Sequence, residues 1–341
     1  MKKALIISII VLVVASIAFG ISVAATGVRE GQGFGISIGP NPFLGTGEAF
    51  GSNTKAGDIK AYTFKDDISD IQIVTSVAET DVRVEDVDEI SVRYETETGG
   101  FIFNARVEGD RLVVKEHGGY LLSIFNIGEK KSKLEVILPE KEYEDVEIIT
   151  ASGNTDIEQL VCKDFNSAVT SGNSKYEIFA PVISVTTTSG YVEVNNCTEN
   201  KAERIKLDSV SGNHTISGFK CDEFKLNSVS GCIKAEGISG KGSADIVSGE
   251  IFIDYAEWDN NLKLNAVSGE FDITLPEDSG VEIDLEALSG EVDVMLSKKE
   301  EGGRGYVQTS LSGESNTGEL GGDNVHEVKV DLVSGEVNIH N

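Results

Sequence analysis

Apolar and polar residues alternate with a period of two along most of this chain, and the pair Ser-Gly interrupts the alternation at regular intervals. In segment 262–275, Leu262 and Leu264 alternate with polar residues before the pair, and Phe271 and Ile273 do so after it. Alternation of this kind is typical of strands that bury one face. The glycine between the two runs indicates a corner. Each unit is therefore predicted to be a strand, a corner and a second strand.

The Ser-Gly pair recurs at a nearly constant interval. Successive serines lie 19, 18, 22, 19, 18, 20, 21, 23 and 22 residues apart. They are Ser152, Ser171, Ser189, Ser211, Ser230, Ser248, Ser268, Ser289, Ser312 and Ser334. Two short strands cannot bury their inner faces alone, so repeated units stack. The pattern predicts an all-β fold, a single-stranded parallel β-helix or β-solenoid with rungs of about 20 residues, regular from residue 146.

The repeated pair is predicted to be structural rather than catalytic. Glycine tolerates a positive φ and close backbone approach, and a serine hydroxyl can bond to backbone groups at a bend. Stacking would also place the serines in a column, as a ladder of hydroxyl groups. None of the repeated pairs lies in a Gly-x-Ser-x-Gly nucleophile motif. The clearest predicted corners are Ser152, Gly153, Ser248, Gly249, Ser268, Gly269, Ser289, Gly290, Ser334 and Gly335.

The residue after each corner glycine changes along the chain from amide to carboxylate. These residues are Asn154, Asn173, Tyr191, Asn213, Cys232, Glu250, Glu270, Glu291, Glu314 and Glu336. One interpretation is a solvated edge, where repulsion of about 1 kcal/mol per neighbouring pair is tolerated. The other is a carboxylate ladder that binds divalent cations through oxygen ligands. Its candidate residues are Glu250, Glu270, Glu291, Glu314 and Glu336, although no repeat typical of calcium-binding solenoids is present.

The N-terminus is predicted to direct export. Two lysines precede an uncharged run from residue 4 to residue 25, long enough for one hydrophobic helix across a bilayer. Residues 1–25 are either a transmembrane anchor or a signal peptide cleaved near Ala25. The first reading gives a single-pass protein held in the cell membrane through residues 4–25, with the C-terminal domain outside; the second gives a secreted protein. Residues 26–65 are predicted to be a Gly-rich flexible spacer, and residues 66–341 the repeat domain.

Charge and scattered reactive residues exclude several function classes. The net charge of −28 argues against nucleic acid and against docking on anionic lipid through a basic face. The histidines form no metal-binding or catalytic motif, so we expect neither a cofactor nor an enzyme. Trp258 is interpreted as a packing residue or, alternatively, as a platform for sugar stacking.

The four cysteines, Cys162, Cys197, Cys221 and Cys232, have no spacing typical of a zinc site. They are either buried free thiols or, for Cys197 and Cys221, a disulfide between neighbouring rungs. The chain ends at Asn341, directly after the last unit. A bare terminal rung is therefore expected, either blunted by charges or docked on a partner.

Two segments resemble a bacterial family of candidate adhesins with repeated β-strands, a domain of unknown function. They are residues 134–153 and residues 271–292, in which Leu-Pro-ended strands lead into Ser-Gly corners. The resemblance covers about residues 67–341 of this chain. It implies an exported or membrane-anchored protein of the kind common in Gram-positive bacteria, some of which are connected to envelope-stress systems. The family has no agreed catalytic or ligand residues to transfer.

These observations favour a non-enzymatic extracytoplasmic surface protein, an adhesin or scaffold displayed on the cell envelope. Its partner would be a cell-surface or envelope protein or a glycan. The alternative is an envelope-stress sensing or regulatory accessory protein that acts through a membrane partner. A carbohydrate-active β-helix enzyme is less favoured, because it would need Asp, Arg, Lys or His clustered in a cleft.

Overall fold

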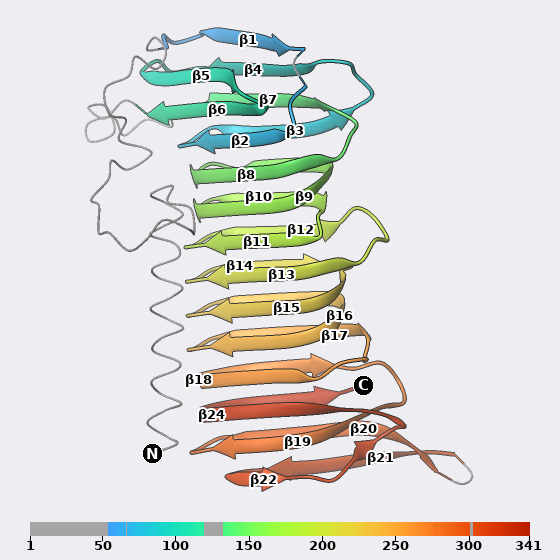
Figure 1. Ribbon diagram of the computed structural model, residues 1–341. Coiled ribbons are helices and arrows are strands. Elements are labelled where there is room, and N and C mark those ends of the chain that lie inside the picture. The colour runs from blue at the N-terminus through green and yellow to red at the C-terminus, as the bar shows by residue number, and fades with distance from the viewer. Residues whose placement is uncertain (1–53, 66, 119–131, 301–302) are drawn as a thin grey trace. The chain divides into compact units, whose positions relative to one another are not determined.

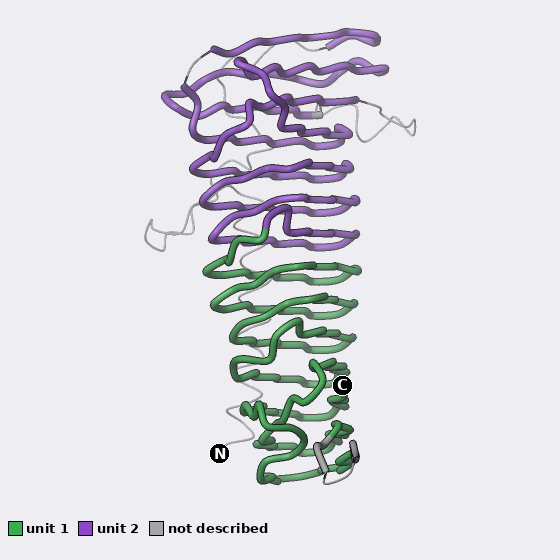
Figure 2. Tube along the Cα trace, turned by 90° about the vertical axis from the view of Figure 1, so that its right-hand side faces the viewer, with its two compact units in different colours: residues 1–19, 199–341 green, residues 20–198 purple. Residues whose placement is uncertain are grey.

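The computed structural model describes residues 54–65, 67–118, 132–300 and 303–341. These residues form two compact units, residues 54–198 and residues 199–341 (Figure 2). The described residues contain strands and no helix, so the prediction of an all-β repeat fold is confirmed. Among them no helix is available to cross a membrane. The hydrophobic helix predicted within residues 1–25 lies outside the described residues.

The unit of residues 54–198 holds twelve described strands. They are β1 (Ile59–Phe64), β2 (Asp70–Thr75), β3 (Glu79–Glu85), β4 (Ile90–Thr96), β5 (Phe101–Glu108), β6 (Arg111–Gly118), β7 (Ser132–Pro139), β8 (Tyr143–Ser152), β9 (Thr155–Ser171), β10 (Asn173–Phe179), β11 (Val182–Thr187) and β12 (Tyr191–Asn196). The unit of residues 199–341 holds twelve more. They are β13 (Ala202–Ser209), β14 (Asn213–Ser217), β15 (Lys220–Ser228), β16 (Cys232–Ile246), β17 (Glu250–Glu257), β18 (Leu262–Thr274), β19 (Ser279–Ala287), β20 (Glu291–Glu300), β21 (Gly303–Leu311), β22 (Glu314–Asn316), β23 (Leu320–Gly321) and β24 (Asn324–His340).

Successive rungs within each unit pair in parallel. In the second unit, Ser209 pairs with Ser228, Ser228 with Ile246, and Ile246 with Ala266, so partners lie 18 to 20 residues apart. The strands after the corners pair in the same way: β14 with β16, β16 with β17, and β17 with β18. Each rung therefore contributes the strand before its corner to one parallel ladder and the strand after its corner to a second one. The repeat interval of the sequence is thus the interval of strand pairing.

The core lies between the two ladders and is filled by the alternating apolar positions. Leu264, Phe271 and Ile273 are wholly buried, as the alternation around Ser268 predicts. Burial of a side chain of this size stabilises a fold by about 1.5–3 kcal/mol. In the rungs of β13 and β15 the inner position nearest the corner is polar, and there Ser209 and Ser228 donate to the carbonyl groups of Ser211 and Ser230. Local hydrogen bonds therefore satisfy the buried hydroxyls at the bend.

At most of the stacked corners the glycine backbones lie in direct contact. Gly249 has a φ of 113°, and a Cβ added to it would lie well inside 3.0 Å of the carbonyl oxygen of Gly231. A Cβ added to Gly231 would meet the carbonyl oxygen of Gly212 in the same way. Both requirements foreseen for glycine, a positive φ and close backbone approach, therefore act at one residue.

The corner serines bond to backbone rather than to one another. Ser248 Oγ donates to the Val229 carbonyl at 3.4 Å, and the Ser248 amide donates to the same oxygen at 2.9 Å. Ser230 does the same with Val210 in the rung before. At these corners the expected ladder of hydroxyl groups is thus replaced by bonds from the hydroxyl to the preceding rung. A carbonyl with two lone pairs accepts both donors, which explains the preference.

The C-terminal strand lies inside its unit, not at the edge (Figure 1). One long edge of β24 pairs in parallel with β18, and the other edge pairs with β19 and β20. Strands β21, β22 and β23 then pair antiparallel with β20 and β19. The expectation of a bare rung ending at Asn341 is therefore wrong. An enclosed terminus resists fraying, and the antiparallel strands cover the parallel edge.

The other unit contains the same arrangement at its first rung. Strand β2 lies between β6 and β8, and β3 lies between β7 and β9. Strands β4 and β5 add antiparallel pairs to β7 and β6. Each unit thus has one enclosed rung, and a neighbouring segment of the chain forms the cap over it. Of the irregular strands before residue 140, β4 to β7 belong to this cap, and β2 and β3 form the rung that it encloses.

A buried carboxylate stabilises the first corner, where the sequence has no Ser-Gly pair. The corner runs through Ser76 and Val77, and the amide of Ser152 in the next rung donates to the Ser76 carbonyl. Glu116 is wholly buried and accepts from the Ser76 amide at 2.7 Å, the Ser76 hydroxyl at 2.8 Å and the Val77 amide at 3.2 Å. Ser132 Oγ donates to its other oxygen. These bonds satisfy a carboxylate that burial would otherwise penalise.

The predicted spacer of residues 26–65 overlaps the folded unit. Strand β1 pairs antiparallel with β4, and the Thr54 amide donates to the Phe101 carbonyl at 2.7 Å. The Thr54 hydroxyl accepts from the Phe101 amide. Thr54 and β1 therefore belong to the folded unit, since this segment adds an antiparallel strand to the cap. The rest of the predicted spacer lies outside the described residues.

His214 is the one histidine enclosed beside a corner of the described 199–341 unit. It follows Gly212 by two residues, is 1% exposed, and its Nε2 contacts Ser209 Oγ at 2.8 Å and the Ser211 carbonyl at 3.3 Å. Because the carbonyl only accepts, Nε2 carries the proton and Nδ1 is left without a partner among the described residues. Burial lowers the pKa of His214 to about 4.

Substitution of a stacked corner glycine should be far more damaging than substitution of an unstacked one. Gly249→Ala should lower the free energy of unfolding by more than about 3 kcal/mol, because the new Cβ meets backbone of the preceding rung. Gly237 has a φ of 62° and open space around it, so Gly237→Ala should lower the free energy of unfolding by about 1 kcal/mol. Gly318 has neither a positive φ nor a close neighbour, so Gly318→Ala should leave the free energy of unfolding unchanged. Chemical denaturation measures all three, and equal costs at Gly249 and Gly237 would contradict the stacking argument.

Stability should fall between pH 6.5 and pH 4 through His214. The unfolded chain binds a proton at the ordinary pKa of 6.5, whereas the folded chain binds it only near 4. The unfolded state is therefore favoured as pH falls, by up to about 3 kcal/mol. His214→Gln should remove this part of the pH dependence. Denaturation of both proteins at pH 7 and pH 4.5 checks it, and parallel losses in the two would show that His214 does not contribute.

Candidate functional site

Four carboxylates that follow corner glycines form one column in the 199–341 unit. Glu250 pairs in register with Glu270, Glu270 with Glu336, and Glu336 with Glu291. Their order in space differs from their order in the sequence, because β24 lies between β18 and β20. Glu314, the fifth predicted member, lies on β22 opposite Glu286 and outside the column. The reason is that Ser312 and Gly313 belong to the cap, where a Cβ on Gly313 would meet nothing.

The column borders a groove, which we call the acidic groove. It has a volume of about 790 Å³ and is lined by the four carboxylates, corner serines and corner glycines. The pKa of Glu270 is raised by its partial burial and by the neighbouring Glu336 and Glu250. Glu270 is central in the column, so it has a carboxylate on each side. Ser310 Oγ donates to Glu291 and Asn338 Nδ2 donates to Glu336, which disperses charge at these two positions.

The acidic groove does not have the geometry of a metal centre. Across the described residues, no three carboxyl, imidazole or thiol groups lie close enough to hold one ion together. Adjacent strands separate the carboxylates by about 4.8 Å along the column, which spreads them rather than converging them. The hypothesis of a cation-binding ladder at Glu250, Glu270, Glu291, Glu314 and Glu336 therefore gains no geometric support. What the groove offers is a negative field.

The 54–198 unit has a second groove at the equivalent positions, which we call the mixed groove. It has a volume of about 370 Å³ and lies over β3, β9, β10 and β12. Its lining includes the post-glycine residues Asn154, Asn173 and Tyr191, together with charged residues of both signs. Tyr191 is 37% exposed. The same backbone position thus has a different chemistry in each unit.

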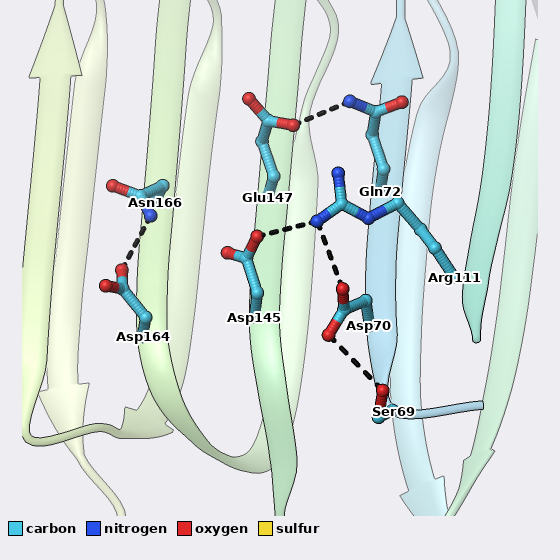
Figure 3. Close-up of polar contacts among 8 residues, drawn as sticks. All are labelled: Ser69, Asp70, Gln72, Arg111, Asp145, Glu147, Asp164 and Asn166. Carbon is cyan, nitrogen blue, oxygen red and sulfur yellow. Dashed lines mark hydrogen bonds and ion pairs between the residues drawn. The ribbon is translucent and has the colours of Figure 1, made fainter. Parts of the chain in front are cut away.

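The strands before the corner in the 54–198 unit present polar side chains that bond to one another (Figure 3). Arg111 Nη2 lies 3.1 Å from Asp70 and 2.9 Å from Asp145, joining carboxylates of neighbouring rungs. Gln72 donates to Glu147 at 2.6 Å in the row beside them. These three pairs span β2, β6 and β8. This face therefore uses its polar groups to hold rungs together, and it is a less favourable candidate for ligand binding.

Several residues that carry reactive groups are enclosed by the fold. All four cysteines are free thiols, so the expected alternative of a Cys197–Cys221 disulfide is not present. Burial raises the pKa of Cys221 to about 12 and that of Cys162 further still, which suppresses thiolate chemistry. Trp258 is 2% exposed and its indole N–H donates to the Gly280 carbonyl at 2.9 Å. It is a packing residue, and its burial rules out the sugar platform.

Sequence reasoning missed the charged members of the mixed groove. Asp156, Lys175 and Glu193 lie two residues after Asn154, Asn173 and Tyr191, and they pair in register across β9, β10 and β12. The signal was present in the alternation, since the second residue after the post-glycine position also faces outward. Arg83 could not be assigned, because its rung has no Ser-Gly pair to align.

Removal of the central charge of the column should stabilise the protein at neutral pH. Glu270→Gln should raise the melting temperature at pH 7 and low salt, because the raised pKa shows that the charged form is disfavoured in the fold. A raised folded-state pKa gives stability that is present at low pH and lost as pH rises, so the gain should vanish well below pH 4. Added salt should reduce the gain in melting temperature, because it screens the repulsion between the carboxylates. Glu319→Gln, exposed and outside the column, is the control; an equal gain there would contradict the explanation.

Solved bacterial structures share a distant similarity with the chain. A candidate adhesin from Bacteroides fragilis is 11% identical, over 82% of this chain and 97% of that one, with a TM-score of 0.38. A candidate adhesin from Parabacteroides distasonis is 13% identical, over 83% and 97%, with a TM-score of 0.42. A candidate lipid-binding protein from the same species is 13% identical, over 82% and 97%, with a TM-score of 0.37. With TM-scores this low, these similarities carry no weight for function.

Comparison with curated proteins gives no match. Comparison with protein families gives a match over residues 68–340, which includes the strands of both units from β2 to β24. This range agrees with the resemblance over residues 67–341 that the strand and corner motifs indicate. The match covers most of the chain, and the chain belongs to the Toastrack DUF4097 family, a domain of unknown function.

Proposed function

We propose that the chain is a non-enzymatic extracytoplasmic surface protein, an adhesin or scaffold whose repeat units present binding grooves at the cell envelope. The observation that carries this proposal is the equivalence of the two grooves. In each unit the strands after the corners hold side chains in register at the same post-glycine position, and the side chains differ between units. A fixed backbone with variable exposed residues is typical of binding scaffolds.

The rigidity of the support favours binding through these positions. The corner glycines contact backbone of the preceding rung, and corner serines donate to its carbonyl groups. Side chains that follow such corners lose little freedom when a ligand binds, which lowers the entropic cost of association. The partner would be a surface or envelope protein or a glycan. The acidic surface of a chain with net charge −28 keeps nucleic acid away.

Export depends on the predicted N-terminal segment. The hydrophobic run of residues 4–25 would hold the chain in the membrane with both units outside, or would be removed near Ala25 as the chain is secreted. Either route places the grooves where an extracellular partner can reach them.

Protease treatment of intact cells tests the proposal. Proteinase K added outside should degrade the repeat domain in cells that express the full chain, and a chain without residues 4–25 should be protected until lysis. The mass of the N-terminus then separates an anchor from a cleaved signal. Full protection of the complete chain in intact cells would contradict an extracytoplasmic function.

A further inference from the structure

We propose that the mixed groove of the 54–198 unit binds an uncharged pyranose oligosaccharide, with Tyr191 as the stacking platform. This inference rests on the proposed function, since it names the class of partner for one of the two grooves. It concerns the positions at which Asn154, Asn173 and Tyr191 follow their corners.

The groove presents two parallel columns of polar side chains. The first column is Asn154, Asn173 and Tyr191, of which the last two pair in register. The second runs from Asp81 through Asp156 and Lys175 to Glu193. Neighbours in a column are about 4.8 Å apart, the spacing of adjacent strands. An extended ligand lying along the columns would meet a polar group at each strand.

Tyr191 is held in place before any ligand arrives. Its hydroxyl donates to Glu193 Oε2 at 2.9 Å, and Asn195 Nδ2 donates to Glu193 Oε1 at 2.7 Å. These two bonds, of which the one from Asn195 has the larger effect, lower the pKa of Glu193 and keep its carboxylate charged. The ring is therefore fixed along the strand while 37% of the residue stays exposed. A fixed aromatic face binds the apolar face of a ring at low entropic cost.

The polar inventory of the groove suits hydroxyl groups. Arg83 and Lys175 donate, Asp156 and Glu193 accept, and the amide of Asn154 does both. A sugar hydroxyl also donates and accepts, so it can pair with either kind of group. The acidic groove of the other unit is lined by carboxylates, serines and glycines, with no cationic side chain. The two grooves therefore select different ligands.

Charge and lining argue for an uncharged glycan over other ligands. Carboxylates outnumber cationic side chains in the groove, so a polyanionic glycan would be repelled. Its lining has no aliphatic side chain, so a peptide would find no pocket for an apolar anchor. A volume of about 370 Å³ lies within the range of small-ligand sites. A short stretch of neutral pyranoses fits each of these limits.

Binding of neutral tetrasaccharides to the full chain in nanodiscs tests the inference. The panel contains α- and β-linked glucose, galactose, mannose and N-acetylglucosamine tetramers, with a heparin-derived tetrasaccharide as the anionic probe. At least one neutral tetramer should bind and the anionic one should not. Tyr191→Ala should weaken that binding at least about tenfold. Tyr191→Phe, which keeps the ring and loses the bond to Glu193, should weaken it less.

Tyr306→Ala is the matched control, since Tyr306 is 70% exposed and lies in the other unit; it should leave glycan binding unchanged. Melting temperatures of the three variants check that each folds. Failure of every neutral tetramer to bind, equal binding by wild type and Tyr191→Ala, or tighter binding of the heparin-derived tetrasaccharide than of any neutral tetramer would each overturn the inference. If the chain is nevertheless exposed on intact cells, the proposed surface function stands and only the glycan assignment falls.

Discussion

Direct contact between glycine backbones at the corners is the constraint on which the rest of the structure depends. A Cβ on Gly231 or Gly249 would overlap the carbonyl of the corner before it, so a rung can approach the preceding one this closely only if its own corner carries glycine. That approach brings the amide of the following residue to the neighbouring glycine carbonyl, at 2.9 Å for Glu250 and Gly231. The post-glycine side chains are then fixed in register. Both grooves are consequences of this packing.

Enclosure of a terminal rung solves the problem that a stack of parallel strands creates. Parallel ladders leave an unpaired edge at each end, and such edges invite aggregation. In the 199–341 unit the chain passes outward to form β19–β23 and returns as β24. The return changes which carboxylates are neighbours, since Glu336 separates Glu270 from Glu291. The cap thus determines the composition of the acidic groove.

Much of the fold could be predicted from the sequence because its determinants are local. The alternation around Ser268 identified Leu264, Phe271 and Ile273 as core, and the interval between Ser-Gly pairs identified the pairing interval. The place of β24 could not be predicted, because its Val-Ser-Gly-Glu motif is the same as those of β17 and β18 and fits any rung. Ser312 and Gly313 have the same Ser-Gly motif, but Gly313 does not stack on another corner, because the tertiary fold places it in the cap. In the sequence, Tyr191 stands out only as an aromatic residue among the asparagines that follow corner glycines. Its proposed role as a stacking platform depends on its bond to Glu193 and on the neighbouring strands.

The spatial order of the post-glycine residues is the claim that connects fold, caps and grooves, and disulfide trapping tests it directly. Residues paired in register on adjacent parallel strands have Cα atoms about 4.8 Å apart, within the range of a disulfide. The double variant Glu270→Cys with Glu336→Cys should form a disulfide on mild oxidation, identified by peptide mass. Glu270→Cys with Glu291→Cys, two strands apart, should not. Rapid disulfide formation in the second pair and none in the first would show that the rungs stack in sequence order, and would contradict this account.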